Sequence, residues 1–90
     1  MAGELKVWGG VELVGGTQTR LVIAARTKKR IAELADAHCD GRFTMRTLDT
    51  YWSEAGDAEE LALVPGQPEE CVWARDEDKH PPQWRRLWPR

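Results

Sequence analysis

The fold is decided by residues 5–25, which read LKVWGGVELVGGTQTRLVIAA from Leu5 to Ala25. Apolar residues occupy every second position of the first half, and Gly9 takes one place in that series. This period of two is typical of a half-buried strand. The alternation predicts that Leu5, Val7, Val11 and Leu13 face a core, with Glu4, Lys6, Trp8 and Glu12 on the other side. Gly9-Gly10 interrupts the series and suggests a bulge or a sharp twist.

Gly15-Gly16 lies between this run and a second apolar run over residues 17–25. A Gly-Gly pair between two strand-like runs indicates a two-residue hairpin turn, because glycine adopts positive φ without steric cost. The sequence therefore predicts an antiparallel hairpin over residues 5–25.

Two helices are predicted next. Thr27 is a suitable N-cap for a helix that ends near Cys39-Asp40-Gly41, and Thr44 can cap a second helix that ends at Gly56. Asp57 and Glu60 have the spacing of a capping box, so a short third helix through Leu61 and Leu63 should follow, stopped by Pro65-Gly66.

A third strand is predicted over Cys71–Arg75. The resulting fold class is α+β: a three-stranded antiparallel sheet in the order β-β-α-α-β, with two or three short helices packed on one face. The predicted division is a compact domain, 1–76, and a Trp/Arg/Pro-rich C-terminal tail, 77–90. The expected core consists of Leu5, Val7, Leu13, Leu21, Ile23, Ile31, Leu34, Leu48, Trp52, Leu61 and Val72.

Composition and charge bear on whether the chain could cross a membrane and on where in the cell it would be found. The chain has 90 residues, 41% of them hydrophobic, and a formal net charge of −2. Residues 53–78 hold nine carboxylates and one arginine, a net of −8, whereas residues 79–90 hold four cations and no acid. No apolar run approaches the ~20 residues that cross a bilayer. The N-terminus lacks a secretory pattern, so we expect a cytoplasmic protein, in the host cytoplasm if it is phage-encoded.

Three segments carry a resemblance: Lys6–Gly9, Gln18–Thr27 and Tyr51–Glu60. They resemble small phage- or prophage-encoded proteins of unknown function, which share an N-terminal hairpin, a helix pair and a Tyr-Trp-Ser-Glu-x-Gly signature. The resemblance covers about residues 5–75. It implies an origin rather than an activity, because the group has no assigned function. The chain differs from the group in a longer segment over residues 38–44 and in its tail.

Reactive groups are sparse. Cys39 and Cys71 lie in no C-x-x-C motif, and a zinc site would need His38 and the distant His80 to converge on them. Adjacent residues of a helix diverge by about 100°, so His38 and Cys39 are poorly placed as a catalytic pair. The glycine pairs do not form a phosphate-binding loop. We expect no enzyme, no cofactor and no bound metal.

The helix pair has the helix sizes of a helix-turn-helix motif. In that interpretation the second helix would contact bases and the start of the first would hold phosphate. The acidic total, Asp49 on the proposed reading face and a turn of about six residues argue against it. The candidate nucleic-acid-binding residues of this alternative, a DNA-binding regulator, are Lys28, Lys29, Arg30, Arg42, Arg46, Thr47 and Thr50.

The tail is the most unusual segment. Trp84, Leu87 and Trp88 fall at i, i+3 and i+4, so one helical turn after Pro82 would place both indoles on one side. The tail could dock on the chain's own acidic block, on a partner, or at a membrane surface, although it is too small for stable membrane attachment unaided.

The first functional hypothesis is a non-catalytic phage or prophage accessory protein that binds a host or phage protein, because Trp and Arg often anchor interfaces. Self-association through edge strands or exposed tryptophans would also help a domain this small. The candidate partner-binding residues are Trp8, Trp73, Trp84, Arg85, Arg86 and Trp88.

Overall fold

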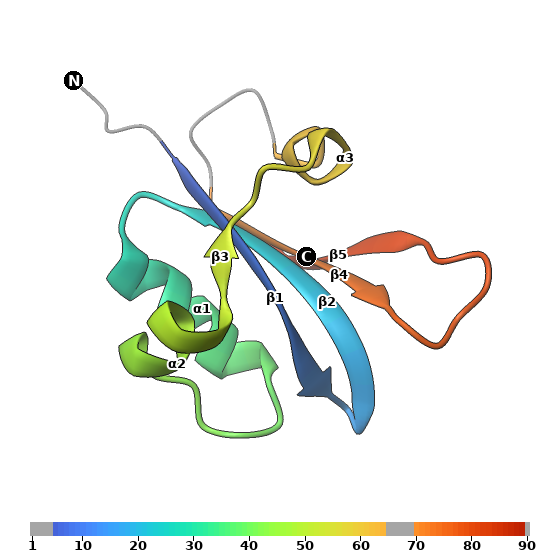
Figure 1. Ribbon diagram of the computed structural model, residues 1–90, viewed down its shortest axis with the longest axis horizontal. Helices are drawn as coiled ribbons and strands as arrows, with labels where there is room; N and C mark the ends of the chain where they lie inside the picture. The colour runs from blue at the N-terminus through green and yellow to red at the C-terminus, as the bar shows by residue number, and fades with distance from the viewer. Residues whose placement is uncertain (1–4, 65–69, 90) are drawn as a thin grey trace.

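A computed structural model describes residues 5–64 and 70–89 of the chain. It contains a five-stranded antiparallel sheet with the strand order β3-β1-β2-β4-β5. The helices α1 and α2 pack side by side on one face of this sheet, and α3 lies apart from them (Figure 1). We call the face that carries α1 and α2 the inner face, and the opposite one the outer face.

The predicted class, α+β, is correct, but the prediction of three strands is wrong. The strands are β1 (Lys6–Val14), β2 (Thr17–Ala25), β3 (Ser53–Glu54), β4 (Cys71–Asp76) and β5 (Trp84–Trp88). The helices are α1 (Lys28–His38), α2 (Met45–Tyr51) and α3 (Ala58–Leu61). The tail supplies β5, which pairs with β4, rather than a helical turn. The predicted second helix was too long, because the chain leaves α2 at Trp52 and adds β3 to the edge of β1.

The hairpin is confirmed, in the register Lys6↔Ala25 to Val14↔Thr17. Gly15 and Gly16 form its turn with φ of 60° and 79°. Their backbone N–H groups donate to the Asp40 carboxylate at 2.6 and 2.7 Å. The Asp40 backbone N–H in turn donates to the Leu13 carbonyl at 2.9 Å. The segment after α1 is therefore fastened to the tip of the hairpin.

Gly9-Gly10 is continuous with the ladder, so the predicted bulge is absent. A Cβ on Gly10 would lie 2.3–2.5 Å from three atoms of the Trp52 indole. A Cβ on Gly9, on the other face, would lie 2.7 Å from Nη2 of Arg20. Each glycine therefore leaves room for one large side chain that lies flat on β1, with Trp52 on the inner face and Arg20 on the outer face.

This arrangement inverts the predicted orientation of β1. Trp8 and Val14 pack against the core, while Val11 and Leu13 are 44% and 53% exposed. Valine, leucine and tryptophan are all apolar enough to cover a core, so the alternation alone did not decide between the two faces. The close approach of Trp52 to Gly10 requires that the even-numbered residues face α2.

Most of the expected core is buried. Seven of the predicted residues lie in the buried cluster of α1, α2, β2 and β4, joined by Phe43 and several alanines: Leu21, Ile23, Ile31, Leu34, Leu48, Trp52 and Val72. The prediction is wrong for Leu5 and Val7, which are half-buried, and for Leu13 and Leu61, which are exposed. Val7 and Leu13 are not in the core because the orientation of β1 is inverted. Leu61 is exposed in a helix of only four residues.

The predicted helix caps are largely confirmed. The Thr27 hydroxyl accepts from the Arg30 N–H, and Thr44 forms a reciprocal capping box with Thr47. Asp57 caps α3, accepting from the Glu59 and Glu60 N–H groups. The Glu60 carboxylate does not complete a capping box, because it pairs with Arg20 on the sheet. The predicted stop at Pro65-Gly66 lies outside the described residues.

Candidate interaction surface

Cross-strand pairing places side chains of the outer face in rows. One row runs across four strands, from Val11 on β1 through Arg20 and Arg75 to Trp84 on β5. The neighbouring row runs from Gly9 through Val22 and Trp73 to Arg86. On β4 and β5 the two rows form a square in which tryptophan and arginine alternate. Trp73 is paired with Arg86, and Arg75 is paired with Trp84. We call Trp73, Arg75, Trp84 and Arg86 the Trp/Arg square.

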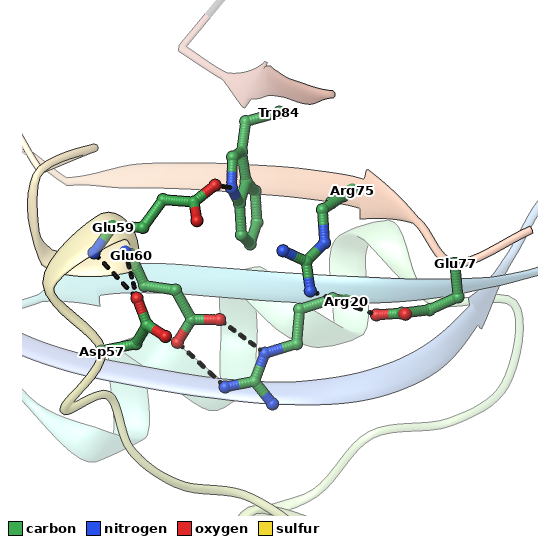
Figure 2. Close-up of polar contacts among 7 residues, drawn as sticks. All are labelled: Arg20, Asp57, Glu59, Glu60, Arg75, Glu77 and Trp84. Carbon is green, nitrogen blue, oxygen red and sulfur yellow. Dashed lines mark hydrogen bonds and ion pairs between the residues drawn. The ribbon is translucent and has the colours of Figure 1, made fainter. Parts of the chain in front are cut away.

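Contacts with Arg75 and Glu59 hold Trp84 in place. The Arg75 guanidinium lies over the Trp84 ring, 4.9 Å from its centroid. The Trp84 indole N–H donates to Oε1 of Glu59 on α3 at 3.0 Å (Figure 2). Arg75 also approaches Glu77, with 3.8 Å between Nη2 and Oε1. Trp84 is half-buried and Arg86 is exposed, so the square presents part of an aromatic surface beside a cation.

An ion pair fixes α3 to the centre of the outer face. Arg20 donates to both oxygens of Glu60, from Nε at 2.8 Å and from Nη2 at 3.0 Å (Figure 2). Glu60 is only 6% exposed, and the hydrogen bonds to it raise the pKa of Arg20. The covered part of the outer face includes Val22, Ala24 and Cys71, all buried. Val11, Leu13 and Arg86 remain exposed around this covered region.

The structure brings three of the predicted partner-binding residues together. Trp73, Trp84 and Arg86 share the outer face, and Arg75 completes their group. Trp8 lies instead on the inner face, where the Lys28 ammonium is 5.0 Å from its ring centroid. Arg85 lies on the inner face, opposite to Arg86, and donates to Asp76. Trp88 pairs with Val72 and is 42% exposed.

Sequence reasoning missed four residues of this face: Val11, Leu13, Arg20 and Arg75. Arg75 could have been found, because residues two apart in a strand share a face and Trp73 was already a candidate. Arg20 could not have been found without the register that pairs it with Arg75. The alternation predicted that Leu13 lies in the core and that Val11 lies on the same side of the strand.

The candidate nucleic-acid-binding residues lie on and around α1 and α2, away from the outer face. Lys28 is paired with Asp49, and Nε of Arg30 with Glu70 at 2.9 Å. The Thr47 hydroxyl belongs to the capping box of α2. Lys29, Arg42, Arg46 and Thr50 are exposed. Because two of its cations are engaged by carboxylates, this arrangement gives the DNA-binding hypothesis less support than the outer face gives protein binding, and it stays a prediction.

Of the two cysteines, Cys39 is half-buried and Cys71 is buried. Burial raises the pKa of the Cys39 thiol to about 12, so it is protonated at neutral pH and is a poor nucleophile. Among residues 5–64 and 70–89, no group of three or more His, Cys, Asp or Glu side chains could hold a metal ion. An open hollow of about 320 Å³ lies beside Cys39 and is lined also by Val11, Glu12, Leu13, Gln18 and Gly41.

Asp76 gives the stability of the β4–β5 unit a dependence on pH. Its carboxylate accepts from Arg85 and lies 3.1 Å from Nζ of Lys79. The hydrogen bond to Lys79, aided by the charge of Arg85, lowers the pKa of Asp76 from its ordinary value of 3.8. A carboxyl with a lowered pKa in the folded state stabilises the fold above its ordinary pKa. That contribution is lost as the pH falls through the lowered value.

We therefore expect Asp76→Asn to reduce the free energy of unfolding at pH 7, and the difference from the wild type to shrink as the pH falls below 3.8. Urea unfolding at a series of pH values from 7 to about 2 measures it, because unfolding free energy depends on proton binding. Asp78→Asn, in the exposed turn after β4, is the matched control. A difference that stays constant over this pH range would contradict the role given to the charge.

Comparison of the chain with models of protein families, with curated proteins and with solved structures found no match. In the described part of the chain, no helix has the length and apolar character needed to cross a membrane.

Proposed function

We propose that the chain is a non-catalytic protein-binding module, a phage or prophage accessory protein whose binding surface is the outer face of the sheet. The observation that carries the proposal is the Trp/Arg square, flanked on the same face by exposed Val11 and Leu13. Aromatic and arginine side chains supply most of the binding energy in protein interfaces. The resemblance of the hairpin and the Tyr51–Glu60 segment to small phage proteins supports the proposed origin.

The geometry favours binding over catalysis. Three ionic or hydrogen-bonded pairs lie on the outer face: Arg20 with Glu60, Arg75 with Glu77, and Trp84 with Glu59. Such pairs hold rings and guanidinium groups in fixed positions, and fixed side chains lose less entropy when a partner binds. A catalytic site would instead converge reactive groups on a cleft. The outer face presents exposed apolar and cationic side chains around its covered part, which suits contact with another protein.

Two double variants test the proposal. Leu13→Ser/Arg86→Ser removes one apolar and one cationic side chain, both exposed, from the outer face. Tyr51→Ser/Arg46→Ser removes an equivalent exposed pair from α2. We expect the wild type and the α2 variant to capture the same partner from a lysate of the producing cells, and the outer-face variant to retain less than about a tenth of it. Quantitative mass spectrometry of the captured proteins measures this.

Thermal unfolding of both variants checks that they remain folded. Equal capture by the wild type and the outer-face variant would contradict the proposal. Loss of capture with the α2 variant alone would place the binding surface on the helix pair.

A further inference from the structure

The sheet ends at β5, which is the last strand in the order β3-β1-β2-β4-β5. In the part of the chain that the structure describes, no strand pairs with the far side of Trp84–Trp88. The N–H and C=O groups on that side of an edge strand are a template for a further strand. Specific recognition by strand addition combines these backbone hydrogen bonds with side-chain contacts on the two faces.

The side chains of β5 indicate what such a strand would carry. Arg86 pairs with Trp73 on the outer face and Arg85 pairs with Ala74 on the inner face. Both are exposed, although Arg85 also contacts Asp76. Successive residues of a strand alternate between faces, and directly opposite residues contact each other. Two adjacent residues of an added strand would therefore each lie beside one arginine, one on either face of the sheet.

Charge argues against a second copy of β5 in that place. Antiparallel pairing of β5 with itself about residues 85 and 86 would bring four guanidinium groups together, and like charges opposite each other destabilise a sheet. A continuous phosphate backbone fits poorly as well, because Asp76, Glu59 and Glu77 lie nearby. A peptide can confine its negative charge to the two positions opposite the arginines.

We infer that β5 accepts, as a sixth strand, an extended protein segment with two adjacent carboxylates flanked by apolar residues. This inference rests on the proposed protein-binding function and names the chemistry of the partner. The carboxylates lie beside Arg85 and Arg86. The flanking apolar residues lie beside Trp84 at one end and beside Leu87 at the other, where Leu87 is the residue left unpaired at the β4–β5 register shift.

The test is a fluorescence-anisotropy titration of the full chain into a labelled peptide with the core Val-Glu-Glu-Val. Peptides with the cores Val-Gln-Gln-Val and Val-Lys-Lys-Val are the comparisons. We expect the glutamate peptide to bind about tenfold more tightly than the glutamine peptide, because each cross-strand ion pair contributes modestly. Two N-methylated peptides complete the set, one methylated at the odd-numbered backbone nitrogens and one at the even-numbered ones. Only every second N–H of an added strand points toward β5, so one of the two peptides should lose binding and the other should keep it.

Variants of the chain test the site. Arg86→Gln should weaken binding of the glutamate peptide about fivefold, and Arg85→Gln/Arg86→Gln about tenfold or more. The matched control, Arg42→Gln/Arg46→Gln, removes two exposed cations elsewhere and should leave binding unchanged. Thermal unfolding identifies any loss of fold through Arg85 and Asp76, and the single Arg86 variant gives a result independent of that contact.

Equal affinity for the glutamate and glutamine peptides would overturn the inference. Unchanged binding of both N-methylated peptides would overturn it too. Competition by oligothymidylate as effective as by unlabelled peptide would assign the surface to nucleic acid and overturn it too. If the peptide fails while partner capture still depends on Leu13 and Arg86, the proposed function stands and only the strand addition is wrong. If the peptide binds but no captured partner depends on the outer face, the proposed function is wrong.

Discussion

Gly10→Ala is expected to destabilise the chain by about 3 kcal/mol, the upper end of the cost of overpacking a core. The new Cβ would lie 2.3 Å from Cδ1 and 2.4 Å from Nε1 of Trp52. The indole has little freedom to move away, because Trp52 is 4% exposed and Phe43 packs edge-on against it at 5.0 Å between centroids. Chemical denaturation, with the unfolding free energy extrapolated to water, measures the effect.

Gly41→Ala is the matched control, since a Cβ at Gly41 meets no atom within 4 Å. We expect it to change the unfolding free energy by less than about 0.5 kcal/mol. In the background of Trp52→Leu, which is itself destabilising, Gly10→Ala should cost less than about 1 kcal/mol, because the two residues are coupled through direct contact. Equal costs of Gly10→Ala with and without the indole would show that the indole does not lie on β1.

Arg20→Met is expected to cost about 2–3 kcal/mol, somewhat below the usual loss for breaking a buried ion pair. The variant leaves the Glu60 carboxylate, whose side chain is 8% exposed, without its bidentate donor. The Arg20 side chain is itself 25% exposed, and this partial solvation lowers the expected loss. Thermal or urea unfolding at pH 7 measures it.

Two further measurements separate the charge from the packing. An unpaired buried carboxyl has a raised pKa in the folded state, so it destabilises the fold above its ordinary pKa and the loss diminishes as the pH falls through the raised value. The deficit of Arg20→Met relative to the wild type should therefore shrink in acid. Arg20→Met/Glu60→Leu should recover most of the stability, because an apolar pair can replace a buried ion pair. A double variant as unstable as Arg20→Met alone would contradict this account.

The sequence was sufficient for the elements whose signals are local. Gly15-Gly16 between two apolar runs predicted the hairpin, and Thr27, Thr44 and Asp57 predicted three helix starts. The strand β5 was not predictable from the local sequence, because Pro81, Pro82 and a charged turn stand directly before it and are not typical of a strand. The spacing of its apolar residues, Trp84, Leu87 and Trp88, fits a helix as well as it fits a strand. Only pairing with β4 decides between the two, and that pairing is not a local property.

The candidate site was predictable to the same limited degree. Trp73, Trp84 and Arg86 were identified by residue type, because indoles and guanidinium groups are common in interfaces. Their arrangement was not predictable, since the square depends on the β4–β5 register. Trp8 was misplaced because the orientation of β1 is set by the contact between Gly10 and Trp52, 42 positions apart in the numbering.

The tryptophans themselves give the most direct test of the outer face as the binding surface. Each of the five has an indole N–H that gives a separate signal in a ¹H–¹⁵N spectrum. Titration with the partner recovered by capture should shift the signals of Trp73 and Trp84 and leave those of Trp8 and Trp52, on the inner face, in place. Shifts of Trp8 together with the backbone amides of α1, with Trp73 and Trp84 unmoved, would contradict the account.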